Sequence, residues 1–227
     1  MQKPGIVVIA AGIIVALVAI NLAFTKNARY YWWYPAIMSP YPDNREEAVV
    51  VVNEYVAKRT QRDVEFAMMV DEAPEKAFQH VISESEMPAS EMREIMMHPL
   101  VVMRVKAYKA LYNRARPHQV LPDRINLESG SMLPLKTADT PSYPAGHAYQ
   151  AYLMASILCA KFPYKKREIE EAADRLAESR IYAGVHYPSD NAFSKSLVKN
   201  HMSGLVSSPE STASSKGATG APLMNSP

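Results

Sequence analysis

Apolar side chains recur every three to four positions along most of the chain, which is the period of an amphipathic helix. Alternation typical of a β-strand does not occur over a useful length. We therefore expect an all-α bundle of about six or seven helices, packed through their apolar faces. The stretches predicted to be helical are 45–63, 64–73, 74–86, 88–98, 100–115, 147–162, 167–183 and 189–201.

One stretch near the N-terminus is apolar all round. Residues 5–24 contain no charged side chain, and Asn21 is their only polar one. A helix of this length spans about 30 Å, the thickness of a bilayer core. The cluster of Tyr and Trp at 30–34 is typical of a membrane–water boundary. We expect a retained single-pass transmembrane anchor rather than a cleaved signal peptide, with its orientation open because the flanking positive charges are nearly balanced.

Composition divides the rest of the chain. A short N-terminus at 1–4 precedes the anchor. After the anchor, residues 25–44 form an aromatic and proline-rich linker, and residues 45–202 form the helical domain. Residues 203–227 are rich in Ser, Ala, Gly and Pro, which predicts a disordered tail. No second apolar run of about twenty residues follows the anchor, so we expect the apolar stretch 152–162 to be a buried core helix.

Charge and cysteine content exclude several classes of function. The formal net charge is +2, and no block of like charge occurs, so nothing indicates a nucleic-acid partner. Cys159 is the only cysteine, which excludes an intramolecular disulfide and a cysteine-based metal cluster.

Three later segments concentrate chemically unusual residues. In the first, KALYNRARP, Lys109 and Arg116 are expected on one face of a helix that ends at Pro117. A solvated basic face is by far the commonest meaning of Lys and Arg on a helix, and it is the favoured explanation of this segment taken alone. In the second, PSYPAGHAY, a tight loop ends at His147, where a helix begins, and Gly146 allows close approach of backbone to a ligand. A helix start suits an anion, although an ordinary turn explains this segment as well.

The third segment, SRIYAGVHYPSD, is bent by a glycine and a proline. Arg180 is expected at the end of one helix, His186 just before the next, and Asp190 in the first turn of that next helix. A carboxylate placed there can hold one imidazole nitrogen and leave the other as a base or nucleophile. The alternative is a structural His–Asp pair between two helices.

Together the three segments contain three permanent cations, Lys109, Arg116 and Arg180, and two histidines, His147 and His186. Three cations around one point repel each other unless an anion lies between them. Phosphate suits such a site because guanidinium groups match its oxygens.

In order and spacing, these segments resemble the tripartite signature of the type 2 phosphatidic acid phosphatase and vanadium-dependent haloperoxidase superfamily. That signature is Lys, six residues, Arg-Pro; then Pro-Ser-Gly-His; then Ser-Arg, five residues, His, three residues, Asp. The resemblance covers 109–190 and implies an acid-phosphatase-like helical domain from about 45 to 200. One position departs from it: Ala145 replaces the signature serine, so a hydroxyl donor is lost while the backbone N–H remains.

The resemblance also implies a role for each matching residue. His186 would attack phosphorus and form a phosphohistidine, and Asp190 would orient His186. His147 would protonate the leaving oxygen and then activate water. No metal or other cofactor is implied, and the sequence contains neither an HExxH motif nor an acidic cluster for Mg²⁺. The implied phosphate-binding residues are Lys109, Arg116, Ala145, Gly146 and Arg180.

The expected function is that of a membrane-anchored, metal-independent phosphatase acting on phosphomonoesters. Its substrate is expected to be a lipid phosphate, such as phosphatidic acid, or a small soluble phosphoester. One alternative is a vanadate-dependent haloperoxidase, although members of that branch are usually much larger. The other is a non-catalytic, membrane-anchored phosphate-binding module, for which Ala145 is the only support.

Overall fold

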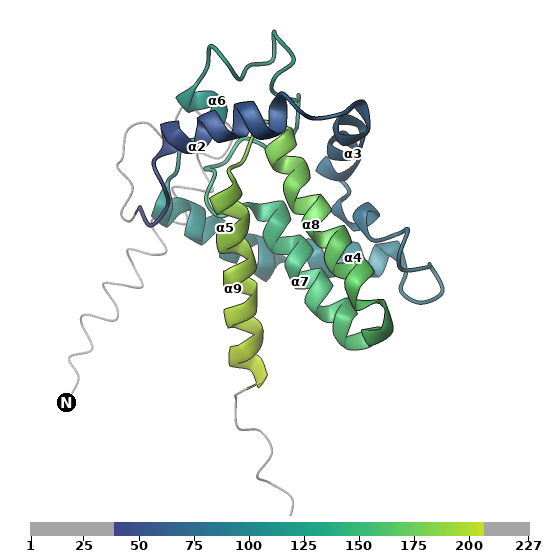
Figure 1. Cartoon of the computed structure of the whole chain (residues 1–227). Helices are drawn as coiled ribbons and strands as arrows, with labels where there is room; N and C mark the ends of the chain where they lie inside the picture. The colour runs from purple at the N-terminus through teal and green to yellow at the C-terminus, as the bar shows by residue number, and fades with distance from the viewer. Residues whose placement is uncertain (1–38, 207–227) are drawn as a thin grey trace, which may run out of the picture.

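The structure, a computed structural model, describes residues 39–206, and its side chains as far as residue 203. All regular secondary structure in this part of the chain is helical, which confirms the predicted all-α class (Figure 1). Six of its α-helices have eight residues or more. The α-helices are α2 (Asn44–Val50), α3 (Gln61–Asp71), α4 (Ala89–Met96), α5 (Pro99–Tyr112), α6 (Pro117–Val120), α7 (Gly146–Lys161), α8 (Lys166–Tyr182) and α9 (Pro188–Val206). The short helical segments are η2 (Val51–Val56), η3 (Pro74–Ala77) and η4 (Pro163–Lys165).

Helix α7 lies at the centre of the bundle and packs against α8 and α9 (Figure 1). Its residues Met154 and Leu158 are fully buried in the largest apolar core, as expected for the stretch 152–162. α4 and α8 also supply side chains to that core, including Met92 and Leu176. A smaller apolar cluster joins α5, α7 and α9. This packing holds the N-terminal end of α7 in the interior, where the titratable residues gather.

Two helix predictions were wrong because local side-chain bonds end or replace the helix. The stretch 45–63 divides after η2, and Thr60 starts α3 through a reciprocal bond with Asp63. The stretch 74–86 is helical only over η3. Further along it, the Ser83 N–H donates to the Glu86 carboxylate, with an N to O distance of 2.9 Å, and such a bond competes with helix formation.

The prediction for 100–115 was wrong at its C-terminal end. Helix α5 ends at Tyr112 because Asn113 adopts a left-handed conformation, with φ of 38°. Arg116 therefore does not lie on α5, and its expected place on one helix face with Lys109 is corrected. It lies in extended backbone before α6, and Pro117 begins that helix instead of ending the previous one.

The bend between α8 and α9 is confirmed. Gly184 has φ of 75°, and a Cβ atom there would lie 2.9 Å from Ile125 Cγ2, so glycine is required. α9 begins at Pro188, which places His186 just before it and Asp190 in its first turn.

The expected membrane anchor at 5–24, most of the linker and most of the tail lie outside the described residues. α9 continues to Val206, past residue 203, where we placed the start of the tail. Between residues 39 and 206, no helix has both the length and the apolar character needed to cross a bilayer.

Candidate active site

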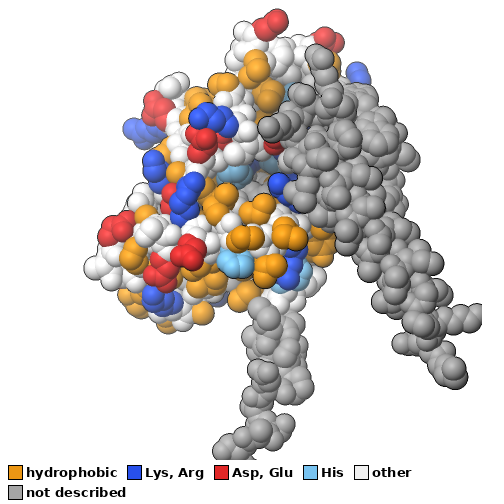
Figure 2. Space-filling model, turned by 180° about the vertical axis from the view of Figure 1, so that it is seen from behind, with side chains coloured by type: hydrophobic (Ala, Val, Ile, Leu, Met, Phe, Trp, Pro, Cys, Tyr) orange, Lys and Arg blue, Asp and Glu red, His pale blue; other side chains and the backbone are white. Residues whose placement is uncertain are grey.

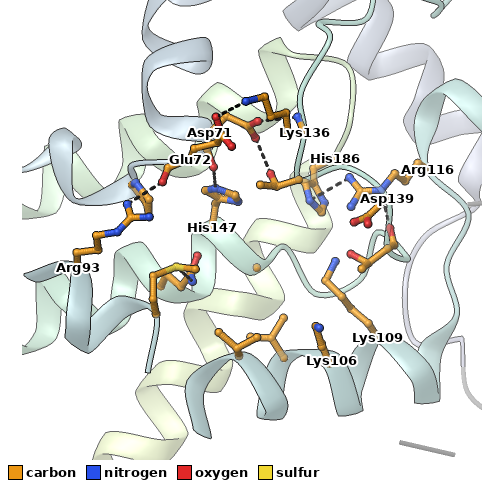
Figure 3. A pocket seen from close by; sticks show the side chains of 18 residues that line it. Asp71, Glu72, Arg93, Lys106, Lys109, Arg116, Lys136, Asp139, His147 and His186 are labelled. Atoms are coloured by element: carbon orange, nitrogen blue, oxygen red, sulfur yellow. Dashed lines mark hydrogen bonds and ion pairs between the residues drawn. The ribbon is translucent and has the colours of Figure 1, made fainter. Parts of the chain in front are cut away.

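A cavity of about 430 Å³ opens beside the first turn of α7 (Figure 3). Residues from the end of α3, from α5, from the loop before α7 and from the bend after α8 line it. Five of the predicted site residues lie on its wall; they are Lys109, Arg116, Gly146, His147 and His186. Segments that are distant in the sequence therefore meet at one place.

His186 and Asp190 form the predicted pair. The His186 Nδ1 lies 2.9 Å from the Asp190 Oδ2, and both side chains are buried. Because a carboxylate only accepts hydrogen bonds, Nδ1 carries the proton and Nε2 retains its lone pair. Nε2 lies 3.3 Å from Nη1 of Arg116 on the cavity wall (Figure 3). The Nε2 lone pair of His186 is thus the one placed at the cavity.

Three further donors hold the Asp190 carboxylate. Oδ2 accepts the backbone N–H of Tyr187 at 2.9 Å and the hydroxyl of Ser142, and Oδ1 accepts Nη1 of Arg114 at 2.7 Å. With both oxygens engaged, the carboxylate has one orientation, and it fixes the ring of His186 in turn.

Arg114 is a site residue that the sequence reasoning missed. Its guanidinium is fully buried and also pairs with Glu47 of α2, with an N to O distance of 2.7 Å. It lies 3.8 Å from the ring centroid of Tyr187, a cation–π distance. The available signal was the first arginine of the segment YNRARP, but it occupies one of the six positions that the signature leaves unspecified. Arg114 provides Asp190 with a permanent countercharge.

Lys109 and Arg116 bring two cations to the cavity. Lys109 is buried and donates to the backbone carbonyl of Pro141. Arg116 donates through Nε to the carbonyl of Thr140 at 2.6 Å and through Nη1 to that of Val185 at 2.7 Å. Burial, together with the charge of Arg116, lowers the pKa of Lys109 well below its usual range. A bound anion would relieve this repulsion.

Arg180 lies behind the cavity wall and is fully buried. Its Nη2 lies 3.0 Å from Oδ1 of Asp71 and donates to Oγ1 of Thr137 at the same distance. Its Nε and Nη1 have no hydrogen-bond partner in the described part of the chain. Both Asp71 and Thr137 line the cavity. Buried N–H groups without a partner are costly, so they favour a bound anion.

His147 lies in the first turn of α7 and points at the end of α3 (Figure 3). Its Nε2 lies 2.9 Å from the backbone oxygen of Asp71, so Nε2 donates and Nδ1 keeps its lone pair. Burial and the cation of Arg180 lower the pKa of His147 from 6.5 to about 3. The imidazole is therefore neutral until an anion raises its pKa.

The same environment acts on His186. Burial, followed by the charges of Arg116 and Lys109, lowers the pKa of His186 well below 6.5. Its imidazole is therefore neutral at physiological pH, as a nucleophile must be.

Asp71 is the second site residue that the sequence reasoning missed. Its carboxylate pairs with Arg180 and its backbone oxygen holds His147, so one residue positions two predicted site residues. Burial raises the pKa of Asp71, but the charge of Arg180 and the hydrogen bond from Thr137 outweigh burial, so the pKa lies below its usual value. No sequence signal was available, since these partners lie far from Asp71 along the chain.

Gly146 and Ala145 differ in their placement. A Cβ atom added to Gly146 would meet only Val105 Cγ1, at an ordinary 3.6 Å, so the space beside this backbone is open to a ligand. Ala145 is fully buried and does not line the cavity. Its N–H is directed at the carbonyl oxygen of Asp190, at 3.5 Å. The phosphate contact expected from Ala145 stays a prediction.

The described residues contain no group of three or more His, Cys, Asp or Glu side chains placed to hold a metal ion. The expectation of a cofactor-free reaction remains a prediction.

Of the comparisons with known proteins, the match to a family model agrees with the resemblance of the three motif segments. The chain is similar to a solved structure described as the first transmembrane PAP2 type phosphatidylglycerolphosphate phosphatase from Bacillus subtilis. The identity is 15%, the TM-score is 0.48, and the match covers 88% of this chain and 98% of that chain. No curated protein matches the chain. The sequence model of the PAP2 superfamily matches residues 95–197, an interval that contains all three motif segments. Over residues 95–197, the chain is therefore similar to the PAP2 superfamily.

Proposed function

We propose that this protein is a membrane-anchored, metal-independent phosphatase that hydrolyses phosphomonoesters through a phosphohistidine on His186. The observation that carries the proposal is the meeting of the His186–Asp190 pair, His147 and buried cations at one cavity. The substrate is a lipid phosphate, such as phosphatidic acid, or a small soluble phosphoester.

In the first step, the lone pair of His186 Nε2 attacks phosphorus and the bond to the ester oxygen breaks. The leaving oxygen takes a proton from His147, which requires that ring to be protonated at Nδ1, because Nε2–H is already engaged by Asp71. The dianionic phosphate supports this protonation, since a negative charge nearby raises the pKa of His147. Asp190 stabilises the positive charge that develops on His186.

In the second step, water attacks the phosphohistidine and the P–N bond breaks. His147, now neutral, accepts the proton of the attacking water, which restores its starting charge. His186 regains the lone pair on Nε2, and inorganic phosphate leaves. The cycle consumes one water and one ester and returns both histidines to their initial states.

The cations supply the electrostatic part of catalysis. Arg116 Nη1 lies beside the attacking nitrogen of His186, and Arg180 has two N–H groups without partners. Positive groups held in a buried site stabilise developing charge more strongly than they would in water. We propose that Lys109, Arg116 and Arg180 provide the charge that a metal ion supplies in other phosphatases.

The experiment is phosphate release from p-nitrophenyl phosphate by the full-length protein in detergent with excess EDTA. We expect activity to persist with EDTA, to vanish in His186→Ala, and to persist in the control His98→Ala, whose side chain is exposed at the start of α5. Quenched reactions should contain an acid-labile phosphoprotein. Activity retained in His186→Ala would overturn the phosphohistidine, and activity lost in EDTA would overturn metal independence.

A further inference from the structure

We propose that Met97, Leu100 and Met103, here called the α5 contact surface, enter a lipid bilayer and bring the cavity to a phosphomonoester held in that bilayer. The inference rests on the proposed function, and it selects a membrane-embedded phosphomonoester as the substrate.

The α5 contact surface is apolar and open to solvent. Met97 is 43% exposed, Leu100 is 66% exposed and Met103 is 51% exposed. Leu100 and Met103 are three positions apart on α5, which makes them neighbours on that helix, and Met97 is the C-cap residue of α4, just before α5 begins. Exposed apolar side chains that gather in one place mark an interaction site. Figure 2 shows a hollow with histidine inside it, bordered by a gathering of hydrophobic side chains.

The surface adjoins the candidate active site. Met97 itself lines the cavity, as do Val102 and Lys106 of α5. Met103 precedes Lys106 by three positions, which makes them neighbours on the helix. Lys109 lies about 9 Å further along the helix axis than Met103, at 1.5 Å per residue. A substrate with its phosphate at Lys109 can therefore extend its hydrocarbon end toward the exposed methionines.

Along α5 the charges match anionic lipid headgroups, while Glu94 of α4 is an exposed carboxylate three positions before Met97. Residues 97–122 contain no Asp or Glu. Arg104 is exposed and Lys106 is half-buried, and neither forms an ion pair within residues 39–206. Apolar side chains flanked by unpaired cations are the combination that binds an anionic bilayer surface.

The length of chain before the described residues is compatible with this placement. The Tyr41 hydroxyl donates to the carbonyl oxygen of Tyr112, so the chain reaches the domain at the C-terminal end of α5. Residues 25–38 separate this point from the apolar run at 5–24, and they can span up to about 50 Å when extended. α5 itself is about 21 Å long. A membrane span at 5–24 therefore leaves enough chain for α5 to lie along the bilayer surface.

The direct test uses the full chain in vesicles of phosphatidylcholine and phosphatidylglycerol. An environment-sensitive fluorophore is attached to Leu100→Cys or Met103→Cys in a Cys159→Ser background, with Leu127→Cys, 58% exposed, as the matched control. We expect the emission at 100 and 103 to shift to shorter wavelength and to be quenched by lipids carrying a nitroxide, while position 127 stays unquenched. Signals at 100 and 103 equal to that at 127 would overturn the proposal. A shift without quenching would place a second protein chain there and would also overturn it.

The functional test compares two substrates. We expect the double variant Leu100→Asp/Met103→Asp to lose about tenfold of its activity on phosphatidic acid in vesicles, because charged side chains resist insertion. Its activity on p-nitrophenyl phosphate should stay within about twofold, since neither side chain lines the cavity. Leu127→Asp should retain both activities. Equal activity of the double variant and the native protein on vesicles would overturn the inference. If the native protein hydrolyses neither substrate, the proposed function fails, while the fluorescence still decides whether this surface meets lipid.

Discussion

Arg114 and Asp190 form a fully buried ion pair, with 2.7 Å between Nη1 and Oδ1. Asp190 therefore links Arg114 to His186, since its other carboxylate oxygen bonds to the imidazole. The position of His186, the proposed nucleophile, depends on a guanidinium that contacts neither the cavity nor His186. We assign Arg114 as a positioning residue.

Replacing Arg114 tests that assignment. Arg114→Met leaves Asp190 and Glu47 without their cation, and breaking a buried pair costs about 3–5 kcal/mol. We expect chemical denaturation to show this loss. The control is Arg124→Met, because Arg124 makes an exposed bond to Asn53. An unfolding free energy equal to that of the native protein would contradict the role.

The conservative variant Arg114→Lys separates the role of Arg114 in orienting His186 from its contribution to the stability of the fold. Lysine keeps the charge but cannot bond to Asp190 and Glu47 in the same fork. We expect kcat for p-nitrophenyl phosphate to fall while KM changes little, and the pH profile of kcat to shift, because the orientation of His186 is loosened. A uniform loss of active protein with an unchanged pH profile would indicate a structural role only.

The proposed protonation of the leaving group by His147 predicts that the loss of activity in a His147 variant depends on the ester. His147→Gln removes the acid, and general acid catalysis contributes roughly 10²–10⁴-fold. We expect a much larger loss with an alkyl phosphate than with p-nitrophenyl phosphate, because nitrophenolate leaves without a proton. Initial rates on the two esters, measured side by side, check this. Equal losses on both would assign His147 to binding rather than to acid catalysis.

The lowered histidine pKa values predict how stability changes with pH. In the anion-free protein, His147 binds a proton only near pH 3, whereas the unfolded chain binds one near pH 6.5. The unfolded state therefore gains protons first, and this contribution destabilises the fold progressively as pH falls from about 6.5 toward 3. Melting temperatures should fall over this range.

Two comparisons separate the contribution of His147 to this loss of stability from that of the carboxylates, which also titrate in acid. His147→Gln should show a weaker decline, and inorganic phosphate should raise the melting temperature, because a ligand that binds only the folded state stabilises it. An identical decline in the native protein and His147→Gln, with no effect of phosphate, would contradict the cation cluster as an anion site.

Ala145→Ser restores the signature residue and predicts a gain. Ala145 is the N-cap of α7 and provides no side-chain hydrogen bond there. A serine at an N-cap accepts a backbone N–H and stabilises by about 0.5–2 kcal/mol relative to alanine. We expect a higher melting temperature and tighter inhibition by inorganic phosphate. Because the position is fully buried, a lower melting temperature would show that the added oxygen lacks space, and it would refute the prediction.

Much of this site could be predicted from local sequence. His186 and Asp190 are four positions apart, so the bend before α9 and one helical turn bring them together. The start of α7 at Gly146 follows from its loop of prolines and glycine. The helical class and most helices followed from the 3.6-residue period, because that period depends on neighbours along the chain.

Other features depended on the tertiary structure. Arg114 meets Asp190 across 76 positions of sequence, and His147 meets Asp71 across the same separation. The periodicity of the sequence cannot predict such pairs, because they form only when the core brings α3, α7 and α9 together. A single left-handed residue, Asn113, ended α5 early and placed Arg116 by a loop rather than by a helix face. The exposure of Leu100 was likewise decided by packing, since the bundle covers one side of α5 and leaves the other open.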